Sequence, residues 1–496
     1  MQTPLVNVKP PKGNLGGAGV KQARFPRLDE PWPGVPDAGS EAELSAPVTH
    51  ITTLGNGLKV ASEDTYSQLA AFGLYVKCGT IREPVHKPGL TLLLERLAFK
   101  STTTRTSAHI VQLSENLGCS MLSVGDKENI VYSILTLRDN LPAALEMVAD
   151  AVLNPVFNEE EIDEQIDAIA AEQESLLNNY EFYMIHYLHK VAFANQPLGK
   201  SPMDYWNTMR DNISREDIIE YKRKHYVGNR IVLAGASVSH SDFVNLAEKY
   251  LGSLPSSTKP IVENPVIYTG GYLYEPLSTE AMNKENFKEY FGLAFKSCGW
   301  IEDDSYPLAI VSKILGGGSS FSAGGPGKGM FSRLYVGFMN QNSHIESAEA
   351  VLTNYEDNGI ISVLSSCQPG NLPELAEGVC VQWMQLAYDI MNRPYEFESE
   401  LTRAKNLLKS TIFTNLEQRS IIADDIGRQV LVYGKRQSGE WVCNKVDSVT
   451  AEDCLRVLLR LFQHPPTVVA IGKQSSLKSM ITFEQIRNYF MRAVQR

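Results

Sequence analysis

The chain has few cysteines, and their spacing would build neither a disulfide frame nor a zinc ribbon. Seven occur among 496 residues, an odd number, and no two form a C-x-x-C pair. Small secreted domains and zinc ribbons both need closely spaced cysteines, so neither class fits. The sequence therefore predicts a reducing compartment and buried free thiols. The cysteines concerned are Cys78, Cys119, Cys298, Cys367, Cys380, Cys443 and Cys454.

Long apolar runs and positive charge are also scarce. No apolar stretch approaches the roughly 20 residues that a membrane-spanning helix needs, so we expect no transmembrane segment. The net charge of −11 argues against nucleic acid as a partner and fits a basic substrate or partner better. Solubility alone would explain the same charge.

The first 28 residues differ from the rest because they contain no acidic side chain. Their basic residues give them the charge pattern of an organelle-targeting peptide. Four prolines in the same stretch would break the amphipathic helix that such peptides form. We expect residues 1–45 to form an extended arm, with a targeting signal either embedded in it or already removed.

One set of patterns occurs twice along the chain. The run Phe72–Gly79 returns as Phe291–Gly299, and each copy predicts a strand that ends in a turn. A helix start with an N-cap and an acid three residues later stands at Ser214 and again at Thr450, and a β-branched run follows each. The matched elements keep their order, as two divergent copies of one domain would. Chance matches of common patterns are the alternative.

The predicted fold class is α+β, with two duplicated domains joined by a linker. Three prolines within residues 254–265 exclude a helix between the two copies. We therefore expect an N-terminal domain at 46–254, an extended linker at 255–285 and a C-terminal domain at 286–496. Long helical stretches are expected in both halves, at 159–178 and 398–416.

Residues 89–102 form a helical segment that would hold zinc if two histidines were present. In the motif H-x-x-E-H, the two histidines share one helix face and chelate zinc, and the glutamate polarises a zinc-bound water. The segment resembles this motif of the pitrilysin-type metallopeptidases, but Leu92 and Arg96 stand at the histidine positions. Only Glu95, at the general-base position, is kept.

The family's third zinc ligand is a glutamate on a later helix, and the resemblance assigns that position to Glu172. An alkyl group and a guanidinium offer no lone pair to a metal. The resemblance therefore implies no catalytic residue and no metal site in this chain. We hypothesise that Arg96 pairs with Glu95 or Glu172 instead. The other close histidine pair, His186 and His189, is interpreted as two ordinary helix histidines.

Half of the fourteen residues from 316 to 329 are glycine. They follow a predicted helix at 306–315, whereas phosphate-binding loops precede a helix, and Gly327-Lys328 lacks the Ser or Thr that completes a P-loop. We exclude nucleotide binding and predict a mobile loop whose backbone meets another chain. A surface insert without function is the alternative. The predicted substrate-binding residues are Gly316, Gly317, Gly318, Ser319, Ser320, Phe321, Ser322, Ala323, Gly324, Gly325, Pro326, Gly327, Lys328 and Gly329.

The glycine-rich loop, with Met330–Tyr335 and Leu94–Thr102, resembles the α subunits of mitochondrial processing peptidases and their relatives, the core 2 proteins of complex III. This resemblance covers residues 46–496. It implies one half of a clamshell heterodimer, in which the loop recognises basic targeting presequences for a zinc-bearing β subunit. It also implies the mitochondrial matrix or the matrix face of the inner membrane.

The partners that this resemblance implies are the catalytic β subunit or core protein 1, presequence peptides and other complex III subunits. Zinc is expected in the β partner, and no cofactor is expected in this chain. One alternative is a purely structural core protein 2 of the cytochrome bc complex (ubiquinol–cytochrome c reductase). The two roles coincide where the peptidase is built into complex III. A third hypothesis, an active metallopeptidase, would need the absent histidines. The loop favours recognition, because a structural role gives no reason for a segment that is costly to order.

Overall fold

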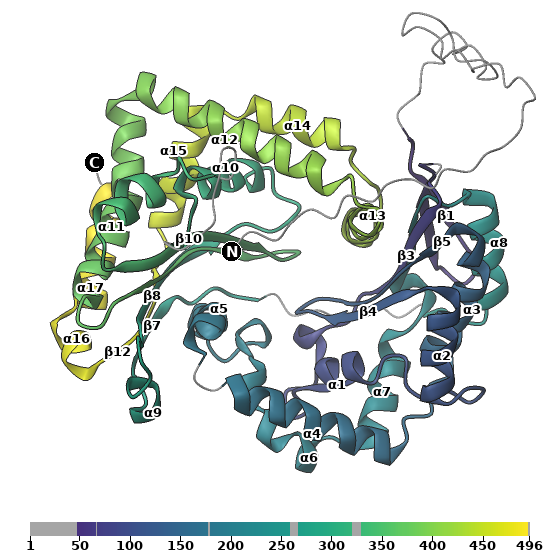
Figure 1. The fold of residues 1–496 in the computed structure, drawn as a ribbon. Coiled ribbons are helices and arrows are strands. Elements are labelled where there is room, and N and C mark those ends of the chain that lie inside the picture. Colours follow the sequence, from purple (N-terminus) through teal and green to yellow (C-terminus); the bar gives the residue numbers. More distant parts are fainter. Residues whose placement is uncertain (1–46, 66, 177–178, 258–265, 320–328, 495–496) are drawn as a thin grey trace, which may run out of the picture. The chain divides into compact units, whose positions relative to one another are not determined.

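Two six-stranded sheets form the framework of the protein (Figure 1). The computed structural model describes residues 47–65, 67–176, 179–257, 266–319 and 329–494, so the predicted arm at 1–45 lies outside the described residues. The first sheet has the order β1-β2-β6-β3-β5-β4, and the second has the order β7-β12-β8-β11-β10-β9.

The elements of the first half are β1 His50–Thr53, β2 Lys59–Glu63, β3 Leu69–Val76, α1 Leu90–Arg96, α2 Ser107–Leu117, β4 Ser120–Gly125, β5 Ile130–Leu137, α3 Leu141–Leu153, α4 Glu159–Leu176, α5 Tyr180–Ala192, α6 Met209–Asn212, α7 Arg215–His225, β6 Ile231–Ala236 and α8 His240–Leu251. Those of the second half are β7 Gly271–Pro276, α9 Thr279–Met282, β8 Glu289–Ser297, α10 Ser305–Leu315, β9 Gly317–Ser319, β10 Ile345–Asn354, β11 Gly359–Cys367, α11 Leu372–Asn392, α12 Pro394–Asn415, α13 Arg419–Tyr433, α14 Gly439–Ser448, α15 Ala451–Phe462, β12 Thr467–Gly472, α16 Gln474–Ser479 and α17 Phe483–Val494.

The strand pairing shows that the two halves are copies of one domain. In the first sheet, β6 is parallel to β2 and antiparallel to β3. In the second, β12 is parallel to β7 and antiparallel to β8. The repeated Phe-Gly-Leu runs lie in β3 and β8, and both predicted capping boxes form, at Ser214 with Asp217 and at Thr450 with Asp453. The predicted α+β duplication is confirmed.

Residues 271–276, within the range predicted as linker, form strand β7. This strand pairs with β12 from Gly271 to Pro276 and takes the place that β2 has beside β6. Its pairing completes the second copy of the sheet, and tertiary pairing of this kind outweighs the local turn signals that flank it.

Each sheet is covered on one face by a helix from the other half of the chain. Helix α13 contacts β2, β3 and β6 of the first sheet, and α5 contacts β7, β8 and β12 of the second. Figure 1 shows α13 beside the strands of the first sheet. At Gly427 of α13, an added Cβ would lie 2.2 Å from the ring of buried Tyr75, so glycine is needed for this close approach.

The turn after β4 also contacts the turn after β10. The carboxylate of Glu128 accepts a hydrogen bond from the backbone N–H of Glu356 at 2.9 Å, and Lys77 pairs with the Glu356 carboxylate at 2.7 Å. Burial raises the pKa of Glu128 to about 7, and the neighbouring Glu356 carboxylate adds to the shift. A partly buried carboxyl group therefore lies between the two copies of the domain.

All seven cysteines are free, and Cys119 is the one that is partly exposed. This agrees with the prediction of buried thiols. Over the part of the chain that the structure describes, no helix is both long and apolar enough to cross a membrane.

Candidate functional site

Helix α1 carries the residues that stand where zinc ligands would be. It begins after Gly89, which adopts φ 103°, a conformation that favours glycine. The buried carboxylate of Glu83 accepts hydrogen bonds from the backbone N–H groups of Gly89 at 2.9 Å and Thr91 at 2.7 Å. A carboxylate at a helix N-terminus satisfies donors that have no partner within the helix. The start of α1 is thereby fixed.

The second histidine position is taken by an ion pair. Arg96 Nη2 lies 2.6 Å from Glu172 Oε2 of α4. One of the two partners proposed for Arg96 from the sequence is therefore confirmed. Both side chains are about one-third to two-fifths exposed, so the bond adds about 0–1 kcal/mol to stability. Its larger effect is on metal binding, because it places a positive charge beside the carboxylate that was expected from the sequence at a metal-ligand position.

Glu95, the general-base position, is turned toward the sheet. Its Oε2 accepts a hydrogen bond from the backbone N–H of Gly125, at the end of β4, at 2.9 Å. Burial raises the pKa of Glu95. The carboxylate therefore ties α1 to an edge strand. Leu92, at the first histidine position, is half-buried and packs against the core of the first domain.

The donors at this site do not fit zinc. Leu92 and Arg96 provide no lone pair, which leaves two carboxylates, each already bound to another group. Across the described residues, no group of three or more His, Cys, Asp and Glu side chains has the arrangement of a metal site. No hydrolytic step through a metal follows from this chain.

The pair His186 and His189 is not a second metal site. His189 Nδ1 donates to the carbonyl of Ile185 at 2.7 Å, and its Nε2 accepts from the hydroxyl of Tyr355 at 2.7 Å. Both ring nitrogens of His189 are therefore engaged in hydrogen bonds. Burial lowers the pKa of both His186 and His189 to about 4, so each ring is neutral at physiological pH.

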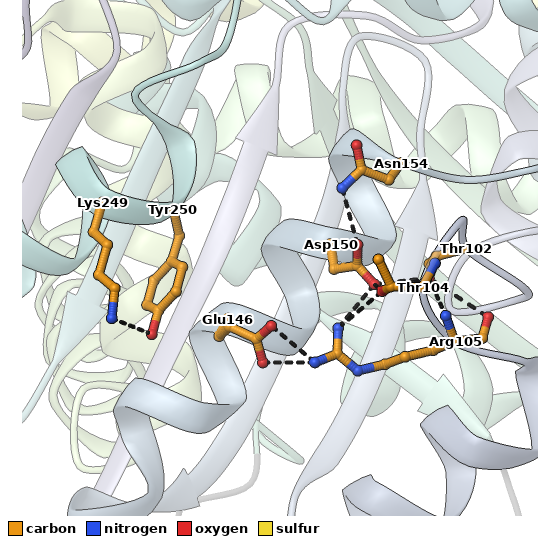
Figure 2. A network of polar contacts seen from close by, with 8 residues as sticks. All are labelled: Thr102, Thr104, Arg105, Glu146, Asp150, Asn154, Lys249 and Tyr250. Atoms are coloured by element: carbon orange, nitrogen blue, oxygen red, sulfur yellow. Dashed lines mark hydrogen bonds and ion pairs between the residues drawn. The ribbon is translucent and has the colours of Figure 1, made fainter.

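A polar network holds the segment that follows α1 (Figure 2). Asp150 of α3 accepts hydrogen bonds from Thr102 and Thr104 at 2.7 Å and from Arg105 at 2.9 Å. Arg105 also binds both oxygens of Glu146, at 2.8 and 2.9 Å. Burial opposes ionisation of Asp150, but these hydrogen bonds lower its pKa. The network anchors the loop at 102–105 on α3, and this loop leads from α1 into α2.

The glycine-rich segment begins against Ser332. Gly317 donates its backbone N–H to Ser332 Oγ at 3.0 Å. An added Cβ on Gly316 would lie 2.3 Å from the Cβ of Ser332, and one on Gly317 would lie 1.9 Å from the carbonyl oxygen of Ala348. The first two glycines are therefore needed for close packing, and we call this arrangement the loop base.

Most of the predicted substrate-binding residues lie outside the described residues, namely Ser320, Phe321, Ser322, Ala323, Gly324, Gly325, Pro326, Gly327 and Lys328. Of the rest, residues 317–319 form strand β9, which pairs with residues 347–349 of β10. This strand was not predicted. Gly318 has open space around its α-carbon, and Gly329 adopts φ 76°.

Arg333 fixes the loop base to two helices, a role that sequence reasoning missed. Its guanidinium binds both oxygens of Glu400 on α12, at 2.7 and 3.0 Å, and Asp389 on α11, at 2.8 Å. All three groups are largely buried. The acids are far from Arg333 in the sequence, so spacing alone carried no signal of the pairing.

A cavity of about 630 Å³ adjoins the loop base, between α10 and α12. Phe331 at its edge is 71% exposed, and the guanidinium of Arg403 lies 4.9 Å from the centre of its ring. Its other lining residues are Lys313, Ile314, Gly329, Met330, Ser332, Glu400, Ala404, Asn406, Leu407 and Ser410.

The fold and the site define a class of protein: a duplicated metallopeptidase-type fold whose zinc-ligand positions hold an ion pair and an apolar side chain. Residues 59–204 match the family described as insulinase, peptidase family M16, and residues 212–408 match the peptidase M16 inactive domain. The chain belongs to peptidase family M16.

Its relatives within this family include mitochondrial-processing peptidase α subunits. The protein of that name from Solanum tuberosum is 36% identical over 434 residues, which cover 87% of this chain and 83% of the relative. A protease from Helicobacter pylori has a similar fold, with a TM-score of 0.75 and 19% identity, over 86% of this chain and 100% of that one.

A chain of complex III2 from Candida albicans, in its Inz-5-bound structure, has the same TM-score of 0.75 and 19% identity. The match covers 89% of this chain and 99% of that one. At this identity the two structures support the fold alone.

Proposed function

We propose that this chain is the non-catalytic α subunit of a mitochondrial processing peptidase, and that it presents basic presequences to a zinc-bearing β subunit. The observation that carries the proposal is the ion pair between Arg96 and Glu172, which occupies two of the three positions where a catalytic subunit would hold zinc. A chain built in this way needs a partner to cut peptides. Relatives that are named α subunits of a peptidase support the presence of such a partner.

The loop base supports a role in substrate handling. Gly316 and Gly317 pack against Ser332, and Arg333 ties the same segment to α11 and α12. A loop that starts from a closely packed base can present its backbone to many different sequences. Such tolerance suits presequences, which share charge and amphipathicity more than sequence.

The charges that would attract a basic peptide are carried by α4. This helix contains eight carboxylates and no Lys or Arg, and Glu159, Glu160, Glu164 and Glu174 are exposed. Such a field raises the association rate of a basic ligand more than its final affinity. Glu174 is two residues from Glu172 on the same helix and the other three lie toward its N-terminus, so the attraction acts along the length of α4.

This function implies a mitochondrial location, in the matrix or on the matrix face of the inner membrane. It also implies a β subunit as partner and presequence peptides as ligands. Integration into complex III is compatible with it. The structural alternative, a core protein that assembles but no longer handles presequences, differs in one measurable respect, which is cleavage.

Reconstitution tests the proposal. We would purify this chain and the zinc-bearing β subunit from the same organism, alone and together, and measure cleavage of a fluorogenic presequence peptide and zinc content. The proposal expects cleavage by the heteromer only, with the zinc carried by β. A heteromer that assembles with zinc yet does not cleave would favour the structural role, and cleavage by this chain alone would overturn the proposal.

A further inference from the structure

Helix α11 has two apolar faces, and only one of them is buried. The inward face packs into the core of the second domain through Leu375, Val379, Trp383, Leu386 and Ile390. A helix that is apolar on one stripe normally turns its opposite face to water with polar residues. On α11 the opposite face is apolar as well. This pattern is typical of a helix that packs against protein on both sides.

The outward face forms a continuous seam. Val381, Met384, Tyr388 and Met391 follow one another at spacings of three and four residues, which places them in one row along the helix. Val381 is 46% exposed, Tyr388 is 51% exposed and Met391 is 48% exposed. Met384 is partly buried and also touches the core. We call these four residues the outer seam.

Helix α11 itself brings acids and no bases to the surroundings of the outer seam. Helix α11 contains Glu374, Glu377 and Asp389 and no Lys or Arg. Glu377 is exposed and continues the outer seam by one more step toward the N-terminus, because it lies four residues before Val381. Exposed Glu396 and Glu398 follow at the start of α12.

One base near each end of α11 is bound to an acid. His344 lies 3.3 Å from Glu374. Arg393 lies 3.9 Å from Asp389 and 3.8 Å from Glu396. The surface is therefore an apolar row with an acidic border, complementary to a helix that has an apolar row with a basic border.

We propose that the outer seam docks a basic amphipathic helix of another protein. Met and Tyr suit such a surface, because both give large contact areas and methionine adapts its shape to the partner. Four side chains on about three helical turns bury less than the roughly 1,000 Å² of a stable subunit interface. The occupant is thus a single helix bound reversibly, and this site is separate from the loop base and from the former zinc site.

The test uses the full-length chain and two labelled peptides of about 18 residues. Both have leucines at three- and four-residue spacing. One has lysines beside the leucines and the other has glutamates. Fluorescence anisotropy measures binding at about 50 mM and about 200 mM salt. We expect the basic peptide to bind at least about tenfold more tightly than the acidic one, with affinity falling as salt rises.

Two variants and a control locate the binding. The double substitution Tyr388→Ser with Met391→Ser should weaken binding of the basic peptide about tenfold, and Glu377→Lys should weaken it while reducing the salt dependence. Val111→Ser is the control, because Val111 is 50% exposed on α2 and should leave binding unchanged. Thermal unfolding checks that each variant is folded.

Four outcomes would overturn the proposal. The first is equal binding of the basic and acidic peptides, and the second is equal loss in the seam variant and the Val111 control. The third is that the wild-type chain self-associates and the Tyr388→Ser, Met391→Ser variant does not. The outer seam would then bind a second copy of the chain. Repeating the titration on the heteromer should give the same affinity. Binding lost on assembly would make the seam a contact with the β subunit and would also overturn it.

Discussion

The guanidinium of Arg96 lies 2.6 Å from the carboxylate of Glu172, so the residue at a former histidine position holds the residue at a former carboxylate-ligand position. Helices α1 and α4 pack beside each other, and the ion pair bridges them. An ion pair thus stands where the resemblance to the metallopeptidases places two metal ligands. This relationship underlies the proposal that the chain is a non-catalytic subunit.

If the backbone geometry is retained, two substitutions should restore metal binding. The double variant Leu92→His with Arg96→His recreates two imidazoles at i and i+4 and releases Glu172 as a third ligand. We expect it to bind close to one zinc per chain in a metal analysis after dialysis, whereas the wild-type chain binds none. Arg96→His alone is the control and should bind weakly, because Leu92 still lacks a donor. Failure of the double variant to bind zinc would show that α1 and α4 no longer have the spacing of a zinc site.

Removal of Arg333 should destabilise the second domain. The side chain is 12% exposed, and Arg333→Gln would leave the largely buried carboxylates of Glu400 and Asp389 without their nearest cation. The expected loss in the free energy of unfolding is about 3 kcal/mol, measured by urea denaturation. Arg393→Gln is the matched control. It removes an arginine that lies 3.9 Å from the same Asp389 but is 55% exposed, so its cost should be about 0–1 kcal/mol. Equal losses in the two variants would contradict a special role for Arg333.

Glu128 should make the stability depend on pH. Burial raises its pKa in the folded protein to about 7, from an ordinary value of 4.5. Between these values the folded state holds a proton that the unfolded state releases. The free energy of unfolding therefore falls as pH rises from about 4.5 to about 7. Above about pH 7 the contribution of Glu128 no longer changes with pH.

Glu128→Gln should remove that contribution, because the amide oxygen can still accept the hydrogen bond from Glu356 but cannot ionise. The variant should gain stability relative to wild type as pH rises from about 4.5 to about 7, measured by denaturant unfolding at several pH values. Glu115→Gln, a change of the same charge at an exposed position, is the control. A stability difference that does not change across this range would refute the argument.

The sequence predicted those parts of the fold that local patterns specify. The helix that precedes the glycine-rich loop begins at Ser305 and ends at Leu315, the two capping boxes form, and the duplicated strands lie at equivalent places in two sheets. Each of these rests on residues that are near one another in the chain, so periodicity and caps are enough.

The packing of α5 and α13 on the sheet of the other half, and the contacts of the loop base, were not predictable in the same way. Helix α13 packs on the first sheet because Gly427 leaves room for Tyr75, a contact across more than three hundred residues of sequence. Arg333 forms ion pairs with acids on two separate helices. At the former zinc site the sequence left two partners open for Arg96, and the packing of α1 beside α4 selects Glu172.

Cleavage by a heteromer without the centre of the glycine-rich loop tests the central claim most directly. Replacing residues 320–328 by a short Gly-Ser bridge keeps β9, Gly317 and Ser332, and hence the described loop base. Size-exclusion chromatography establishes that the variant still assembles with the β subunit, and a fluorogenic presequence peptide reports kcat/KM. The proposed function predicts a fall of about tenfold or more, equivalent to about 1.4 kcal/mol of transition-state stabilisation. Unchanged kcat/KM in the assembled variant would contradict it.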